Sequence, residues 1–204
     1  MFLLDYPQGS QEWLEFRRCG IGASDAPVLM GVGYKDDSPY RLWREKMFGE
    51  SKEINPSMLR GKSFEPMIRA LAEQKAGISF IADTMYQSVD KLWQFASLDG
   101  INHEERVILE CKYTSKINHD LAREDKVPEK YYPQIQHQLA CLPEKYSYCI
   151  YASYHEKCED NLILVKVPRD ASYIKKLITT EEAFYRDHML TGIAPPEPKE
   201  KKAK

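Results

Sequence analysis

A short segment near the middle of the chain constrains the fold most, because it combines strand-forming residues with two acids and a lysine. Asp99 and Gly100 are followed by a polar stretch and then by Val107-Ile-Leu-Glu-Cys-Lys112. Apolar and β-branched runs of this kind favour strands. Successive side chains of a strand point to opposite faces, so Glu110 and Lys112 share one face. Residues 100–102 are predicted to form the turn of a hairpin that brings Asp99 beside them.

Two carboxylates and a lysine on one face are the groups that a metal-dependent nuclease needs. Mg²⁺ binds one or two protein carboxylates and takes its remaining ligands from water and substrate phosphate. A neighbouring lysine can orient or deprotonate the attacking water, or neutralise the charge that develops on phosphorus. The same pattern also describes an ordinary surface hairpin with an ion pair across one face. The motif alone leaves both interpretations open.

Three further segments stand in order around this motif. Trp13-Leu-Glu-Phe-Arg-Arg-Cys-Gly-Ile-Gly-Ala-Ser-Asp-Ala-Pro27 and Arg60-Gly-Lys-Ser-Phe-Glu-Pro66 precede it, and Tyr131-Tyr-Pro-Gln-Ile-Gln-His-Gln-Leu139 follows it. In this order the four segments resemble the YqaJ-like viral recombinase family, also known for the phage lambda exonuclease, within the PD-(D/E)xK nuclease superfamily. The resemblance runs from about Trp13 to about Ser153 and therefore covers most of the chain.

The resemblance implies a fold and a metal site. The implied fold is α/β, with a restriction-endonuclease-like α/β/α core in which helices flank a central mixed sheet. Asp99 and Glu110 resemble the family's metal ligands, and the backbone carbonyl of Cys111 would be a further ligand. Lys112 resembles the catalytic lysine. The implied cofactor is Mg²⁺, for which Mn²⁺ could substitute.

The resemblance also assigns residues on two predicted helices. Glu65 would assist with the metal or the water, and Gln136 would lean on the site near the lysine. Because Pro66 follows it, Glu65 also fits the first turn of a helix, where an acid interacts favourably with the helix dipole. Three alternate glutamines cannot share one helix face, so Gln134 and Gln138 are predicted to lie on a solvated surface.

A second group of residues resembles the part of the family that surrounds a terminal 5′-phosphate. Ser24 also precedes Asp25 and an Ala-Pro pair, a pattern that predicts a helix cap, and helix N-termini attract anions. At position 116 the phage lambda enzyme has arginine, and lysine lacks its bidentate fork. Phosphate binding could then be weaker, or shared with Arg123. The group comprises Arg17 or Arg18, Ser24, Ser97 and Lys116.

Length and composition bound the organisation of the chain. Its 204 residues suffice for one substantial domain, predicted to span 1–194, with a disordered charged tail over 195–204. Five cysteines without a CxxC pair predict free thiols in a reducing cytoplasm. No run approaches the roughly 20 apolar residues of a membrane-spanning helix.

The net charge of −2 gives no overall attraction to DNA, whose binding depends on neutralising phosphates. Binding would therefore rest on local basic residues and, by resemblance, on enclosure of the DNA in a ring-shaped homotrimer. The histidines show no paired metal-ligand spacing, and His137 is expected to be structural.

Sequence patterns predict helices and strands along the whole chain. Predicted helices cover 10–18, 24–30, 38–47, 57–75, 128–142 and 170–189. Predicted strands cover 78–81, 85–88, 93–98, 106–113, 147–154 and 161–167.

The resemblance implies that the chain would be a Mg²⁺-dependent, processive 5′-to-3′ exonuclease acting on linear double-stranded DNA ends. It would release mononucleotides and leave a 3′ single strand for a single-strand annealing protein. By the same resemblance, the chain would be encoded by a phage or prophage and would act in the cytoplasm of the bacterial host. Two alternatives remain: a structure- or sequence-selective endonuclease on the same fold, and a catalytically inactive DNA-binding or assembly module.

Overall fold

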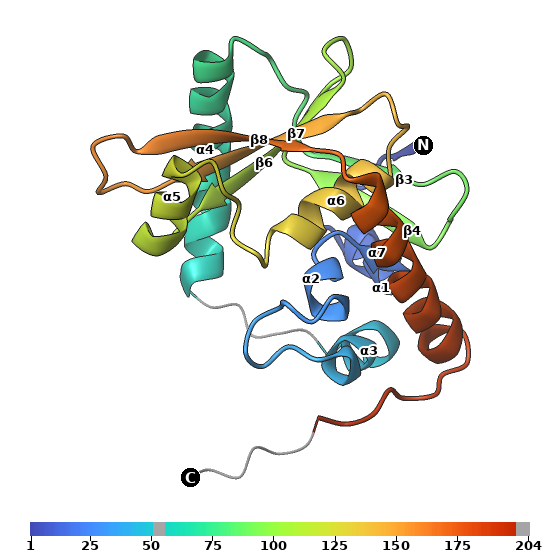
Figure 1. The fold of residues 1–204 in the computed structure, drawn as a ribbon. Helices are drawn as coiled ribbons and strands as arrows, with labels where there is room; N and C mark the ends of the chain where they lie inside the picture. Colours follow the sequence, from blue (N-terminus) through green and yellow to red (C-terminus); the bar gives the residue numbers. More distant parts are fainter. Residues whose placement is uncertain (51–55, 199–204) are drawn as a thin grey trace, which may run out of the picture.

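Helices and strands alternate along the chain in the computed structural model, which describes residues 1–50 and 56–198 (Figure 1). The helices are α1 (Gln11–Arg18), α2 (Ala26–Leu29), α3 (Pro39–Phe48), α4 (Pro56–Ala76), α5 (Lys116–Arg123), α6 (Tyr132–Ala140) and α7 (Ala171–Phe184), followed by the π-helical turn η1 (Tyr185–Met189). The strands are β1 (Phe2–Leu4), β2 (Ile21–Gly22), β3 (Thr84–Gln87), β4 (Gln94–Leu98), β5 (Gly100–Asn102), β6 (Val107–Tyr113), β7 (Tyr148–Tyr154) and β8 (Leu162–Pro168).

The strands form two four-stranded sheets, in the orders β1-β3-β4-β2 and β5-β6-β7-β8. Each sheet is mixed, because β2 runs parallel to β4 and β6 runs parallel to β7 among otherwise antiparallel pairs. The predicted α/β fold, with a central mixed sheet flanked by helices, is confirmed as to class and mixed strand directions. The strands are divided between two sheets, and the chain passes from one to the other at Asp99, between β4 and β5.

Side-chain alternation along β6 fixes which layer each residue meets. Val107, Leu109 and Cys111 pack with α4, whose Ile68 and Ala72 are fully buried. The intervening residues of β6 face the opposite layer, which α6 and α7 form on the other side of the sheet (Figure 1). Burying one large apolar side chain contributes about 1.5–3 kcal/mol. Two apolar layers therefore hold β6, with its Glu-Cys-Lys sequence, in one register.

Glycine is required where the chain passes between the two sheets. A Cβ at residue 100 would lie 2.8 Å from Cβ of Phe80 and 3.2 Å from Cβ of Leu109. The first of these contacts is closer than real Cβ atoms allow, so Gly100 lets β5 approach its neighbours directly after Asp99. The Asp-Gly pair that suggested a turn therefore serves a close approach of strands.

Several predicted elements differ from the structure. Residues 100–102 form β5, and the hairpin turn lies at 103–106, where Arg106 takes a positive φ of 56°. The predicted strand 78–81 contributes only an isolated bridge at Ile81. The sequence patterns also missed β1, β2 and the short helix α5. Residues 199–204, most of the predicted tail, lie outside the described residues.

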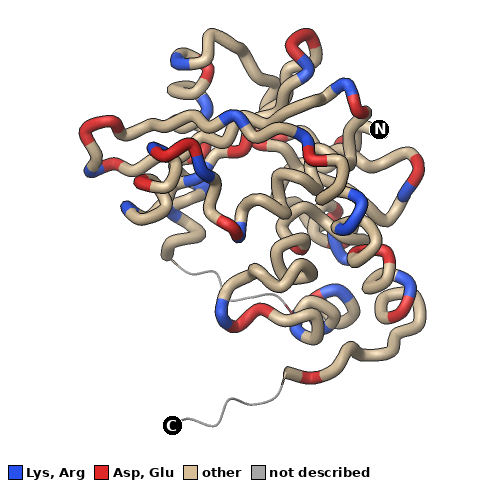
Figure 2. Tube along the Cα trace, viewed as in Figure 1, with Lys and Arg blue, Asp and Glu red and all other residues tan. Residues whose placement is uncertain are grey.

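Charges of both signs are interspersed along the chain, and neither sign takes over one side of the view in Figure 2. This distribution agrees with the net charge of −2. Any attraction for a polyanion must then come from local groups. Within the described ranges, no helix is both long and apolar enough to cross a membrane.

Candidate active site

The acids and the lysine of the central motif meet where β4 passes into β5 beside β6. Asp99 Oδ2 accepts a hydrogen bond of 2.7 Å from the backbone N–H of Cys111. Glu110, whose side chain is 1% exposed, forms an ion pair with Lys112 on the same face of β6. The structure therefore brings Asp99, Glu110 and Lys112 together. Strand alternation predicted the shared face of Glu110 and Lys112, and the β5–β6 hairpin brings Asp99 beside them although its turn is not at 100–102.

Glu65 reaches this cluster from α4, on the other side of the sheet. One turn later, Arg69 Nη1 donates to the backbone oxygen of Asp99 at 2.5 Å and lies 3.7 Å from Glu65 Oε1. Because α4 begins at Pro56, Glu65 and Pro66 lie in the helix interior. The interpretation of Glu65 as a first-turn acid is therefore wrong, and Arg69 is a site neighbour that the sequence motifs did not indicate.

The glutamines of α6 are arranged opposite to the prediction. Gln134 Nε2 donates to Glu110 Oε1 at 2.6 Å, and Gln138 Nε2 donates to Glu110 Oε2 at 2.5 Å. Gln136 instead donates to the carbonyl of Pro168 and accepts from the N–H of Asp170, both at 2.9 Å.

The reason is the helical spacing itself. Residues four apart lie on one face, so Gln134 and Gln138 point the same way and Gln136 points elsewhere. The solvated surface predicted for Gln134 and Gln138 is wrong, and so is the expected contact of Gln136 with the site. Gln136 joins α6 to the junction of β8 and α7.

The carboxylates of the cluster crowd one another. Burial, together with the charges of Glu110 and Glu65, raises the pKa of Asp99 well above its ordinary range. Burial and the charge of Asp83 raise the pKa of Glu65. Burial alone would lower the pKa of Lys112, but the charges of Glu110 and Asp99 outweigh it and raise that pKa. The site thus carries a surplus of acids, and Lys112 stays protonated.

This donor set fits a hard divalent cation. Among the described residues, no group of three or more histidine, cysteine, aspartate or glutamate side chains is placed to hold a metal. Mg²⁺ needs only one or two carboxylates, since water and phosphate complete its shell. Ser97 Oγ and Gln138 Oε1 are buried without a hydrogen-bond partner among the described residues, and such atoms usually contact water or a ligand. Crowded acids and unpaired polar atoms both suit Mg²⁺ with bound water.

The residues predicted to surround a 5′-phosphate are only partly together. Arg17 Nη2 donates to Ser24 Oγ at 2.7 Å, and its guanidinium lies 4.5 Å from the ring centre of Trp13. Arg18 turns away and donates to the backbone oxygens of Lys46 and Met47 at the end of α3. Arg17 is therefore the arginine that approaches Ser24.

Ser24, Ser97 and Lys116 occupy different settings. Ser24 is exposed and does not cap α2, because Asp25 flanks that helix and its side chain bonds to the N–H of Gly22. Ser97 lies on β4 two residues before Asp99, and its carbonyl accepts from Gln138 Nε2 at 3.4 Å. Lys116 is exposed at the start of α5 and pairs with Asp120 at 2.6 Å.

A buried ion pair supports the Arg17–Ser24 corner. Lys46 Nζ lies 2.5 Å from Asp25 Oδ2 and donates to the backbone oxygen of Arg17 at 2.9 Å. It thereby ties α3 to the end of α1 and to the turn that carries Ser24. We assign Lys46 a structural role, because its ammonium binds the Asp25 carboxylate and the Arg17 backbone oxygen.

His137 has the structural role predicted for it. Its Nδ1 lies 2.6 Å from Glu181 Oε1, and its Nε2 lies 2.9 Å from the backbone oxygen of Phe95. Because a carbonyl only accepts, Nε2 carries the hydrogen. His137 thus connects α6 with α7 and β4, and it helps to fix the helix that presents Gln134 and Gln138.

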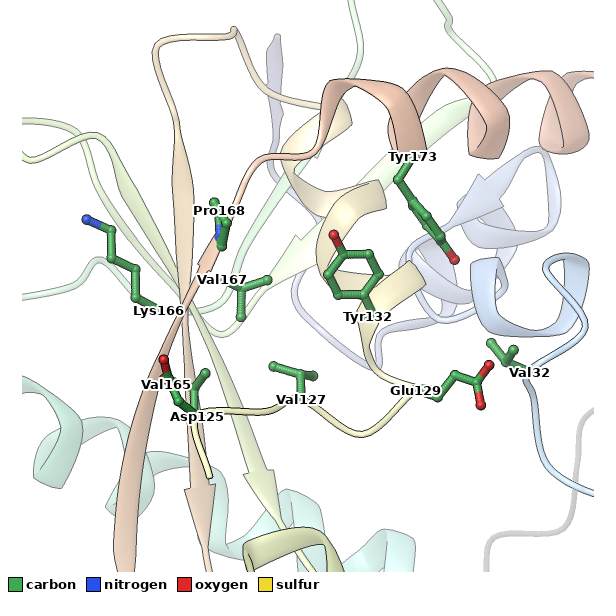
Figure 3. A pocket seen from close by; sticks show the side chains of 10 residues that line it. All are labelled: Val32, Asp125, Val127, Glu129, Tyr132, Val165, Lys166, Val167, Pro168 and Tyr173. Carbon is green, nitrogen blue, oxygen red and sulfur yellow. The ribbon is translucent and has the colours of Figure 1, made fainter. Parts of the chain in front are cut away.

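A cavity of about 340 Å³ lies beside β8 and α6 (Figure 3). Valines and tyrosines dominate its lining, with Tyr132 and Tyr173 on one side and Val165 and Val167 on β8. None of the motif acids lines it. The cluster around Glu110 is therefore the candidate active site, and this cavity is separate from it.

Residues 12–145 match the model of the YqaJ-like viral recombinase domain. The chain belongs to this family. One relative, the uncharacterized protein YqaJ of Bacillus subtilis (strain 168), is 28% identical over 187 residues, which make up 90% of this chain. The chain spans 58% of that relative's length, less than two thirds. The family membership suggested by the four ordered segments is confirmed.

Two solved structures share the fold of this family member. An alkaline exonuclease, LHK-Exo from Laribacter hongkongensis, superposes with a TM-score of 0.76 at 23% identity, covering 89% of this chain and 94% of its own. A phage related exonuclease from Haemophilus somnus 129PT gives a TM-score of 0.62 at 14% identity, covering 85% and 96%. At these identities the likeness establishes the fold.

Proposed function

We propose that this chain is a Mg²⁺-dependent exonuclease that degrades the 5′-ended strand of linear double-stranded DNA. The observation that carries the proposal is the meeting of Asp99, Glu110, Glu65 and Lys112 at one point of the fold. Membership of a recombinase family and the fold shared with two exonucleases support the same reaction class.

The chain's own residues divide the chemistry. Asp99, Glu110 and the carbonyl of Cys111 would hold the Mg²⁺, which supplies a nucleophilic water and neutralises phosphate charge. Glu110 and Asp99 raise the pKa of Lys112 in the metal-free site, and Lys112 would stabilise negative charge on the reacting phosphate or orient the water. Glu65 would accept a hydrogen bond from the attacking water.

Gln134 and Gln138 would act through Glu110. Each donates to one of its carboxylate oxygens, so together they set the plane and the direction of that carboxylate. Such outer contacts orient metal ligands and commonly change affinity or activity by about 10- to 100-fold. We assign them the place beside the lysine that the sequence prediction gave to Gln136.

End selection would rest on the Arg17–Ser24 corner. Arg17 is stacked on Trp13 and directed at Ser24, and a held guanidinium is suited to a terminal phosphate. Ser97 lies nearer the acids. Lys116, exposed at the start of α5, would contact the DNA backbone if its pair with Asp120 opened. Processive release of mononucleotides, a homotrimeric ring and delivery of the 3′ strand to an annealing protein belong to the same proposal, as does action in a bacterial cytoplasm.

The proposal is tested with linear duplex DNA labelled at one 5′ end, with and without a 5′-phosphate, and with closed circular DNA as control. Mg²⁺ and Mn²⁺ are compared with EDTA. We expect selective loss of the phosphorylated 5′ strand into mononucleotides and an intact circle. Cutting of the circle would indicate an endonuclease on the same fold, and binding without cutting under either metal would indicate an inactive module.

A further inference from the structure

Aromatic rings and lysines alternate in a short series that leads from the surface to the active site. The ammonium of Lys130 lies 4.5 Å from the ring centre of Tyr34 and 4.9 Å from that of Tyr131. The ammonium of Lys112 lies 5.4 Å from the ring centre of Tyr131. Tyr34, on the loop between α2 and α3, is thus linked to Lys112 by three successive contacts.

The loop that carries Tyr34 is held in shape before any ligand arrives. The backbone N–H of Tyr34 donates to Asp37 Oδ2 at 2.8 Å, and the N–H of Asp37 returns a bond of 2.9 Å to the Tyr34 carbonyl. A Cβ at Gly33 would lie 2.8 Å from the same Asp37 oxygen, so glycine permits this closed turn. Tyr34 is therefore presented by a fixed turn.

The ring of Tyr34 is braced but open. Lys130 covers it through a cation–π contact, and the Tyr34 hydroxyl lies 3.5 Å from the Lys130 ammonium. Tyr34 nevertheless remains 64% exposed. An exposed tyrosine held in one orientation loses little conformational entropy when a flat ligand stacks on it.

We propose that Tyr34, braced by Lys130, stacks on a nucleobase of the DNA strand that enters the active site. Proteins that bind single-stranded nucleic acid commonly use such rings, because every base offers a π-face. Asp36, Asp37 and Glu129 offset the charges of Lys35 and Lys130 in these two segments. With no surplus of positive charge for a phosphate, the exposed ring favours a base. This inference rests on the proposed function and adds a contact that selects for an unpaired base near the cut.

The test replaces the ring and the base separately. Tyr34→Ala, Tyr34→Phe and Lys130→Ala are compared on linear duplexes in which one residue near the 5′ end of the cleaved strand is abasic, at each terminal position in turn. The pair of the exposed Lys166 with the half-buried Tyr148, at 4.2 Å, supplies control variants, Lys166→Ala and Tyr148→Ala. Tyr148 pairs with Val107 at the start of β6, away from Lys112. Thermal melting checks that each variant is folded.

We expect Tyr34→Ala to raise KM about 5- to 100-fold, the usual range for one stacked base, with little change in kcat. Tyr34→Phe should keep most of the affinity, and Lys130→Ala should fall between them. One abasic position should cost the wild-type protein affinity but cost Tyr34→Ala nothing further, as expected for two halves of one contact. The control variants should behave as wild type at every position.

An unchanged KM for Tyr34→Ala, or equal losses from every abasic position in wild type and variant, would overturn the stacking contact. End binding is measured in parallel by fluorescence anisotropy of the same duplexes without catalytic metal. A protein that never cuts would refute the proposed function, yet the anisotropy series would still decide between stacking and no stacking.

Discussion

Two buried lysine–carboxylate pairs in this molecule share one chemistry but differ in their surroundings. Lys46 and Asp25 have side chains that are 2% and 6% exposed, and each finds its remaining partners in the backbone. Lys112 and Glu110 have side chains that are 24% and 1% exposed. Asp99 and Glu65 place further negative charge around this second pair. One pair is complete and the other stands in a surplus of acids.

The difference appears in the pKa values of the acids. Burial raises the pKa of Asp25, but Lys46 and Arg17 outweigh it and hold that pKa below its ordinary range. Burial and neighbouring acids raise the pKa of Asp99 instead. A buried acid whose pKa is lowered in this way stabilises the fold, whereas crowded acids cost stability and mark a functional site. The acid surplus, and not the ion pair itself, therefore distinguishes the candidate active site.

The largest expected effect comes from removing one acid of the surplus. Asp99→Asn keeps an oxygen for the N–H of Cys111 but removes a proposed metal ligand, so cleavage should fall by about a thousandfold or more, several kcal/mol of lost transition-state stabilisation. The metal-free variant should melt at a higher temperature than wild type, because crowding is relieved.

Differential scanning calorimetry with and without Mg²⁺ measures the stability of wild type and of Asp99→Asn. Wild type should be stabilised by about 2.7 kcal/mol when Mg²⁺ is a hundredfold above Kd, and the variant should lose this response. An Mg²⁺ effect on melting that survives in Asp99→Asn would contradict Asp99 as a ligand.

The complete pair should respond in the opposite way. Lys46→Met leaves Asp25 buried without its cation, which is expected to cost about 3–5 kcal/mol of unfolding free energy, measured by urea unfolding. The same change at Lys112 leaves Glu110 bonded to Gln134 and Gln138, so it should cost less stability while abolishing cleavage. Equal stability losses at the two lysines would remove the distinction between the pairs.

A smaller effect is expected where α6 contacts Glu110. Gln134→Ala and Gln138→Ala should each lower kcat by about 10- to 100-fold, the range for contacts that orient a metal ligand. Gln136→Ala is the matched control on the same helix, since its bonds reach Pro168 and Asp170. That variant should lose stability and keep kcat. Steady-state cleavage of labelled duplex measures all three, and a kcat loss confined to Gln136→Ala would reverse the assignment.

These glutamines also show what the sequence could and could not predict. Strand alternation placed Glu110 and Lys112 on one face, because that rule is local to β6. Helix spacing showed that the glutamines could not all share a face. It could not show which face meets Glu110, since that depends on how α6 packs against the sheet.

The remaining gaps have similar physical causes. Arg69 and Asp99 are 30 residues apart in the sequence, and Tyr34 and Lys130 are 96 residues apart. No local sequence pattern therefore marks either contact. The position of Glu65 was ambiguous because Pro66 usually begins a helix, and here it lies inside one. The order of motifs indicated the family, but packing decided the contacts.

The smallest expected effect is on the pH dependence of stability. On acidification, Asp25 and Asp99 should change the free energy of unfolding in opposite directions. Because the folded-state pKa of Asp25 lies below its ordinary value of 3.8, its contribution to stability is complete above that value and disappears as the pH falls through the folded pKa. For Asp99 the folded pKa is raised, so its penalty in the metal-free protein is complete above that pKa and disappears on acidification, before Asp25 responds.

A folded-state pKa that differs by one from the unfolded-state pKa changes the free energy of unfolding by about 1.4 kcal/mol. Urea unfolding in EDTA from neutral to acid pH should therefore show the advantage of wild type over Asp25→Asn shrinking below pH 3.8, and its deficit against Asp99→Asn shrinking at higher pH. Two differences of the same sign would mean that both acids are held by the same balance of charge.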